Sequence, residues 1–172
     1  FYNFSYQYAQ GRDALPGVQP ILTPVEHPDE ISTIFDGAIV YAKGACVMLM
    51  LEKWLGQVQF ARALGQFLAK FAYQNPTTDD FLATFEQISG KPVTKFMHQW
   101  LEQSGFPLVE LRDQTLSQRQ FGYDSQQTWP IPLGAEASQA DLPEVLWQAE
   151  ANANQQSCFI NRDIVGFMVT NY

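Results

Sequence analysis

The stretch from residue 42 to residue 51 constrains the fold of this chain more than any other, because Lys43 is its only charged residue. It lies within the segment IFDGAIVYAKGACVMLMLEKWLG. A helix without a polar face has to be covered by other parts of the molecule, so we expect this one to be buried nearly all round. Asp36 is a favourable N-cap and Gly56 a favourable end, which predicts a helix between them.

Tyr41 is the second unusual residue of this segment, because it places a phenol in the second turn of an apolar helix. A buried phenol needs a hydrogen-bond partner. The residues alone leave two interpretations open, an ordinary core tyrosine bonded to a backbone carbonyl or a functional donor. Gly37 and Gly44 have no side chains, so another group can approach the backbone near Tyr41 closely. Lys43 is expected to pair with a carboxylate or to extend to the surface.

Three further helices are predicted after this segment. The first spans residues 57–73 and carries an apolar face at helical spacing, formed by Phe60, Leu64, Phe67 and Phe71. The second spans residues 77–90, with Thr77 or Thr78 as its N-cap. The third begins at Pro92, which is tolerated in a first helical turn, and ends before the sequence SGFP.

The remaining parts of the chain lack the apolar periodicity of a helix. Residues 1–33 are rich in aromatic residues and proline without a helical period, and are predicted to be irregular. After residue 106 come short β-branched and aromatic segments between turn residues: PLVEL, TLSQRQF, TWPIPL, EVLWQAEA, SCFI and IVGFMVTNY. The predicted fold is α+β in two segregated parts, a helical bundle-like domain at residues 1–106 and a small antiparallel β-sandwich domain at residues 107–172.

Composition excludes several classes of function. The formal net charge of −8, with only 10 lysines and arginines in 172 residues, argues against a nucleic-acid partner. No apolar run reaches the roughly 18 residues that a membrane-spanning helix needs, so no membrane segment is expected. The two cysteines, Cys46 and Cys158, lie far apart, and Cys46 falls in the apolar helix. Cysteines that do not pair in a disulfide indicate a reducing compartment, so we expect a cytoplasmic location.

The titratable residues form no recognisable metal or acid–base motif. His27 and His98 are the only histidines, and His98 shares a helix face with a single carboxylate, Glu102. Two ligands do not make a zinc site, so we interpret both histidines as solvated or capping residues. Asp79 and Asp80 are adjacent at a predicted helix start, where they point to different sides and suit the positive end of the helix dipole.

Several segments, taken in order, resemble one protein family. FDGAIVYAKGA is similar to the FD-x-I-x-Y-x-KGA segment of the aminopeptidase N family of zinc metallopeptidases, the gluzincin aminopeptidases. YQNPTTDDF and WLEQSGFPLV resemble that family's Y-x-N-A-T-x-x-D-L and W-x-x-Q-x-G-x-P-x-V motifs. The segments WPIPL and INRDIVGFMVTNY are similar to its β-sandwich domain. The resemblance covers nearly the whole chain.

The resemblance implies a function for Tyr41. In the family, the tyrosine at this position donates its hydroxyl to the oxyanion that forms when a zinc-activated water attacks an N-terminal peptide bond. Asp36, Lys43 and Gly44 match the motif and are interpreted as structural residues. The HExxH zinc motif and the Gly-x-Met-Glu-Asn segment are absent from this chain, and the resemblance implies that both lie before Phe1. The chain is therefore expected to be a fragment that neither binds zinc nor cleaves peptides, although its parent does both.

Two alternatives to this interpretation stay open. The chain can be a complete, non-catalytic module in which helices and a β-sandwich bind another protein. It can also belong to a relative that has lost its metal site and kept Tyr41. Under the fragment interpretation, the apolar helix lacks partner helices, and we expect self-association through the uncovered surface.

Overall fold

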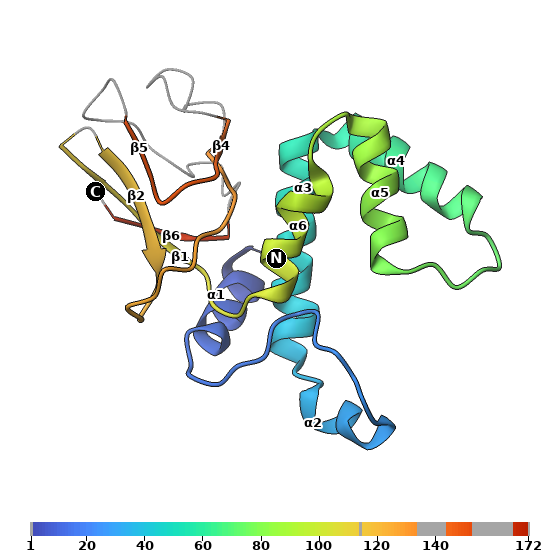
Figure 1. Cartoon of the computed structure of the whole chain (residues 1–172), viewed down its shortest axis with the longest axis horizontal. Helices are drawn as coiled ribbons and strands as arrows, with labels where there is room; N and C mark the ends of the chain where they lie inside the picture. The colour runs from blue at the N-terminus through green and yellow to red at the C-terminus, as the bar shows by residue number, and fades with distance from the viewer. Residues whose placement is uncertain (1, 114, 134–143, 153–166, 172) are drawn as a thin grey trace.

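Helices and strands occupy different parts of the chain. The computed structural model describes residues 2–113, 115–133, 144–152 and 167–171. Helices precede Pro107 and strands follow it. Figure 1 shows the strands on one side of the molecule and helices α3 to α6 on the other. The fold is α+β, as the sequence predicts.

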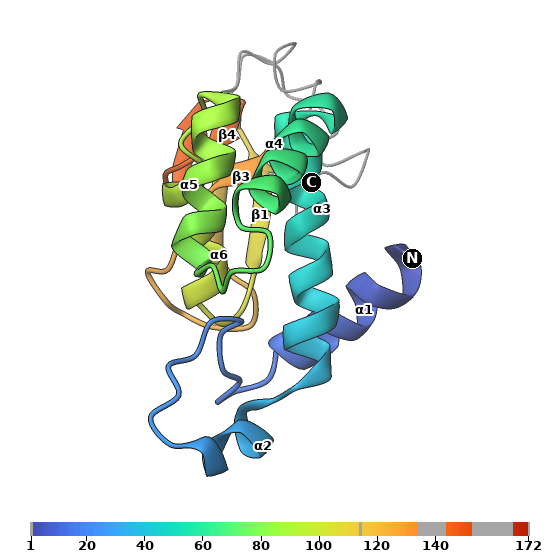
Figure 2. The same cartoon turned by 90° about the vertical axis from the view of Figure 1, so that its right-hand side faces the viewer.

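The helical part contains both long and short helices. In chain order they are α1 (Tyr2–Asp13), the 3-10 helix η1 (Pro28–Glu30), α2 (Ile31–Ile34), the π-helix η2 (Ala38–Lys43), α3 (Gly44–Leu55), α4 (Gln57–Lys70), α5 (Thr78–Ser89) and α6 (Val93–Glu102). Figure 2 shows α3 and α5 upright, with α1 beside the lower part of α3. None of the helices in the described part of the chain is long and apolar enough to cross a membrane.

The ends of α5 confirm the prediction made from its cap residues. The Thr77 hydroxyl accepts from the backbone N–H of Asp80 at 3.2 Å, and the Asp80 carboxylate accepts from the Thr77 N–H at 2.9 Å. This reciprocal pair satisfies two backbone donors that a helix start leaves free. Gly90 ends the helix in the left-handed conformation, with φ of 69°. The local sequence therefore determines both ends of α5.

The prediction that residues 1–33 are irregular is wrong for α1. Tyr6, Ala9 and Asp13 are all buried and recur at spacings of three and four, so this helix does have one inward face. That face carries one large apolar residue, one alanine and one carboxylate, and hydrophobic periodicity does not reveal such a pattern. Packing against the rest of the molecule stabilises α1, since isolated helices of this length are marginal in water.

The predicted helix from Asp36 to Gly56 is present but is not continuous. Its first part is the π-helix η2, and α-helical geometry begins only at Gly44. Asp36 Oδ1 accepts from the backbone N–H of Ala38 at 2.9 Å, as expected of a residue that caps a helix start. The π-helical turn was not predicted, because the sequence there has ordinary helix-forming residues. Gly56, with φ of 82°, separates α3 from α4.

The strands form a four-stranded sheet and a two-stranded sheet. Their bounds are β1 (Pro107–Arg112), β2 (Thr115–Gln120), β3 (Ile131–Pro132), β4 (Val145–Leu146), β5 (Glu150–Asn152) and β6 (Val169–Asn171). The larger sheet has the order β5-β2-β1-β6, and β3 pairs with β4. β1 is antiparallel to β2 and parallel to β6. The strand expected at residues 157–160 lies outside the described residues.

One contiguous hydrophobic core joins the helices to the strands. Trp100 of α6 is fully buried, and its indole N–H donates to the carbonyl of Pro130 at 2.9 Å. Phe106 and Phe167 also meet in this core, with ring centroids 5.6 Å apart. The division into two domains between residues 106 and 107 stays a prediction.

Candidate active site around Tyr41

Tyr41 lies in η2, and its side chain points out of the molecule. It is 68% exposed, and its ring meets that of Phe35 edge-on, with centroids 5.6 Å apart. The prediction of a helix buried nearly all round is therefore wrong at this position. Lys43, only two residues away, is completely buried. The reason is that the neighbouring elements in this chain cover only one side of the segment.

Asp36 lies just before the π-helical turn that carries Tyr41, and it is hydrogen-bonded to Arg12 of α1. The Arg12 guanidinium donates to Asp36 Oδ2, while Asp36 Oδ1 accepts from the backbone N–H of Ala38. The hydrogen bond from Arg12 is the largest cause of the lowered pKa of the Asp36 carboxyl, and the N–H of Ala38 adds to it. Asp36 thus caps the turn and joins it to α1 at the same time.

The turn ends at Lys43, a buried residue whose ammonium group has three oxygen partners. Its Nζ lies 2.9 Å from Asp13 Oδ2 and donates to the backbone carbonyls of Gln103 at 3.1 Å and Gly105 at 3.0 Å. Burial lowers the pKa of Lys43, and the charge of Asp13 opposes that shift. The prediction that Lys43 pairs with a carboxylate is confirmed. The ammonium group therefore has two hydrogen bonds to backbone carbonyls and one opposite charge within 3.1 Å, as a buried charge requires.

Gly105 completes this network and has to be glycine. Its backbone N–H donates to Asp13 Oδ1 at 2.8 Å, so that Asp13 contacts both Lys43 and the loop that receives it. The φ of Gly105 is 84°, and an added Cβ would lie 2.5 Å from the Gln120 amide nitrogen. A side chain at this position would therefore be strained and would displace Gln120.

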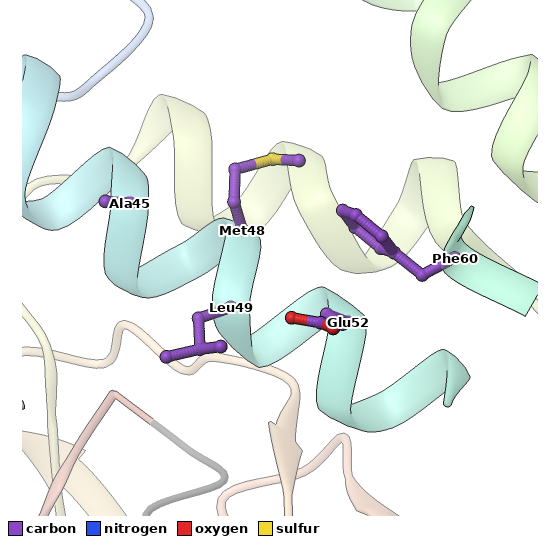
Figure 3. A pocket seen from close by; sticks show the side chains of 5 residues that line it. All are labelled: Ala45, Met48, Leu49, Glu52 and Phe60. Atoms are coloured by element: carbon purple, nitrogen blue, oxygen red, sulfur yellow. The ribbon is translucent and has the colours of Figure 1, made fainter. Parts of the chain in front are cut away.

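A partly covered apolar face of α3 continues from Tyr41. A shallow cavity of about 410 Å³ lies on this face, lined by Ala45, Met48, Leu49, Glu52 and Phe60. Figure 3 shows that four of these side chains come from α3 and that the ring of Phe60 reaches toward Met48 from α4. Tyr41, Ala45 and Met48 follow one another at helical spacing, so they share one side of the segment. Tyr41 is thus at one end of an apolar surface.

The comparison with protein families identifies the chain. The Peptidase family M1 domain matches residues 2–100. This range includes Tyr41, Lys43 and Asp13, while the carbonyls that Lys43 also contacts, those of Gln103 and Gly105, follow it. That match covers more than half of the chain. The chain belongs to peptidase family M1. Its resemblance to the aminopeptidase N family is confirmed by the same match and by the curated relatives.

The curated relatives of this M1 chain come from bacteria, plants and animals. Aminopeptidase N of Lactococcus lactis subsp. lactis (strain IL1403) is 44% identical over 146 residues, which are 80% of this chain and 17% of that protein. Aminopeptidase M1-A of Oryza sativa subsp. japonica is 44% identical over 128 residues, covering 70% and 14%. Glutamyl aminopeptidase of Bitis rhinoceros is 32% identical over 159 residues, covering 92% and 16%. The M1 chain therefore spans about a sixth of the length of these relatives.

The described residues of the M1 chain do not fit a zinc ion. They contain no group of three or more histidine, cysteine, aspartate or glutamate side chains arranged to hold a metal. Both ring nitrogens of His98 already face carboxylates, with Nδ1 2.7 Å from Glu102 and Nε2 3.2 Å from Asp79. His27 instead caps η1 by accepting from the N–H of Asp29. The interpretation as a capping residue is confirmed for His27, while His98 lies between two carboxylates instead.

The sequence motif of the M1 chain contains Tyr41, Asp36 and Lys43, but it does not reveal that Asp36 pairs with Arg12 and Lys43 with Asp13. These two contacts were not predicted, because the segment that contains Arg12 and Asp13 was expected to be irregular. The sequence GRD does place opposite charges side by side, complementary to Asp36 and Lys43. That complementarity is a signal, although a weak one, because residues distant in sequence can pair in many ways.

Proposed function

We propose that this chain is part of an aminopeptidase that removes N-terminal residues from peptides, with Tyr41 as a catalytic residue. The observation that carries the proposal is the segment FDGAIVYAKGA, within the part of the chain that matches the M1 family. The relatives named above, each called an aminopeptidase, support the same reaction class. In this proposal the substrate is a peptide with a free amino terminus.

The chemical role proposed for Tyr41 is to donate a hydrogen bond to an oxyanion. When water adds to the carbonyl carbon of a peptide bond, the carbonyl oxygen takes up the electron pair and becomes negative. A phenol O–H held near that oxygen stabilises the tetrahedral intermediate. The exposed position of Tyr41 supports this role, since its hydroxyl can reach a substrate bound outside this chain.

The zinc ion that the family resemblance implies belongs, in this proposal, to residues that this chain does not supply. The chain has two histidines and no HExxH motif. We expect the isolated chain to bind no zinc tightly and to have no peptidase activity. Elemental analysis of the purified chain tests the first point, and one zinc per chain would contradict it.

The proposal includes the organisation and location of the parent protein. Residues 1–106 are proposed to be the C-terminal helical part of its catalytic domain, and residues 107–172 a β-sandwich domain. The start of β1 at Pro107 and the end of the family match at residue 100 support that division. The proposed cytoplasmic location rests on Cys46, a buried free thiol.

The decisive experiment replaces Tyr41 by phenylalanine in the full-length enzyme. Hydrolysis of leucine anilide or alanine anilide is measured with and without a chelator. We expect a chelator-sensitive activity whose kcat falls about 10²-fold in the variant with little change in KM, because the lost bond forms mainly in the transition state. Tyr73→Phe is the matched control, because Tyr73 is fully exposed outside this site, and it should retain the wild-type kcat.

The other outcomes of this experiment separate the alternatives. An active enzyme whose Tyr41→Phe variant keeps its kcat would remove Tyr41 from the mechanism. A full-length protein without any activity would support the non-catalytic interaction module or the relative that has lost its metal site. The sequence that precedes Phe1 in the gene separates these two, since only a former peptidase would retain traces of the zinc motif.

A further inference from the structure

The π-helical turn that carries Tyr41 is bonded to α1 on both sides of the tyrosine. Asp36, two residues before the turn, pairs with Arg12 and accepts from the backbone N–H of Ala38, the first residue of the turn. Lys43, the last residue of the turn, pairs with Asp13. Arg12 and Asp13 are consecutive at the end of α1, so a single helix end holds both ends of the turn.

The Lys43 contact is difficult to rearrange because it is completely buried. The side chains of Lys43 and Asp13 both have 0% exposure, and the ammonium group also bonds the carbonyls of Gln103 and Gly105. Any rotation of the turn would leave one of these charges buried without its partner, which is strongly unfavourable. The Lys43 network therefore determines where the turn lies relative to α1 and the loop before β1.

The π-helical geometry directs Tyr41 to the opposite side from this network. The backbone N–H of Gly44 bonds the carbonyl of Ile39, five residues earlier, as well as that of Tyr41. A π-helical turn is wider than an α-helical one and occurs often at functional sites. Because Tyr41 is 68% exposed and its described ring contact is with the half-exposed Phe35, its position depends on its backbone.

We propose that Arg12, Asp13 and Lys43 are positioning residues that hold the turn so that the Tyr41 hydroxyl points at the reacting carbonyl group. This inference rests on the proposed function of Tyr41 and adds to it the residues that orient the phenol. None of the three touches the substrate. Their effect on the reaction passes through the backbone of residues 38–43.

Arg12 gives the cleanest test because it is partly exposed, so its replacement leaves no buried charge unpaired. The steady-state kinetics of the full-length enzyme are measured for Arg12→Gln, Arg12→Lys, Tyr41→Phe and the double variant Arg12→Gln/Tyr41→Phe. We expect Arg12→Gln to lower kcat about 10-fold or more with little change in KM, because misplacement by about 1 Å can cost up to 10²-fold. Arg12→Lys keeps the charge and should recover most of that loss.

The double variant distinguishes positioning from a general structural effect. If Arg12 acts through Tyr41, adding Arg12→Gln to Tyr41→Phe causes no further loss of kcat. If the two losses multiply, or if Arg12→Gln alone keeps the wild-type kcat, the inference is overturned. Arg62→Gln, on the exposed surface of α4, is the matched control and should leave kcat unchanged. Thermal unfolding of each variant shows whether a loss of activity comes from a loss of folded protein.

The buried pair is tested by Asp13→Asn/Lys43→Met, which removes both charges together and avoids an isolated buried charge. We expect this folded variant to lose kcat as Arg12→Gln does, again without additivity to Tyr41→Phe. If the variant does not fold, the Arg12 series alone decides. A Tyr41→Phe enzyme with full kcat would instead overturn the proposed role of Tyr41, and the positioning role with it, so the two failures can be told apart.

Discussion

At the scale of the residue, two side chains two positions apart have opposite environments. Lys43 is completely buried and Tyr41 is mostly exposed, although both belong to the same apolar segment. Cys46, one turn after Lys43, lies on the buried side, and burial raises the pKa of its thiol to about 12. The burial of a residue along η2 and α3 therefore depends on which side of the helix it occupies.

The burial of Cys46 predicts slow thiol chemistry in the folded chain. The thiolate is the reactive form, and raising the pKa from 9.0 to about 12 lowers its population roughly 10³-fold at pH 8. In a Cys158→Ser background, labelling of Cys46 by a maleimide should be slower than in urea by at least that factor. The unfolded chain is the control, and equal rates in both states would contradict the burial of Cys46.

At the scale of the element, helix ends differ in how much the local sequence determines them. The start of α5 is defined by Thr77 and Asp80, three residues apart, which satisfy each other's backbone donors. The start of η2 is defined by Asp36 together with Arg12 from another helix. The first could be predicted from neighbouring residues, while the second needs a contact between residues distant in the chain.

The capping box of α5 predicts a pH-dependent stability. Hydrogen bonds from Thr77 lower the pKa of Asp80 below its ordinary value of 3.8. The stabilisation is therefore complete above pH 3.8 and is lost as the pH falls through the lower pKa of the folded state. Urea unfolding should show wild type more stable than Asp80→Asn at pH 7, with the difference shrinking below pH 3.8. Asp124→Asn, which changes an exposed carboxylate after β2, is the control. A difference between wild type and Asp80→Asn that does not change with pH would contradict the prediction.

At the scale of the whole molecule, one core serves the helices and the strands, while one helix face is only partly buried against it. The core includes Trp100 of α6, Val109 of β1 and Phe167 before β6. The face from Tyr41 to Phe60 is apolar and only partly covered. A full-length peptidase of the length of the relatives has ample chain to cover this face.

The uncovered face predicts self-association of the isolated chain. A monomer has a mass of 19.5 kDa, and light scattering at micromolar to millimolar concentration should show about twice that mass. Met48→Glu places a charge on the face beside Glu52 and should restore the monomer. Leu15→Glu, in the loop after α1, is the matched control and should leave the mass unchanged. A wild-type chain that stays monomeric throughout would show that this face needs no partner.

Much of the helical part follows from the sequence alone. The helices α4, α5 and α6 have regular apolar spacing and strong capping or breaking residues, which act within a few residues of one another. The change from helices to strands near Pro107 is visible in the same way, since β-branched and aromatic residues there alternate between turn residues. The role proposed for Tyr41 also comes from the sequence, through the motif that contains it.

The tertiary structure alone decided the surroundings of Tyr41. It formed α1 from a segment without recognisable periodicity, introduced the π-helical turn, brought Arg12 and Asp13 to the ends of that turn, and left Tyr41 on the exposed side. The physical reason is that these features depend on contacts between residues 24 to 92 positions apart. Such contacts are stabilised by burial and by opposite charges, and neither acts within the short windows in which a sequence determines its local structure.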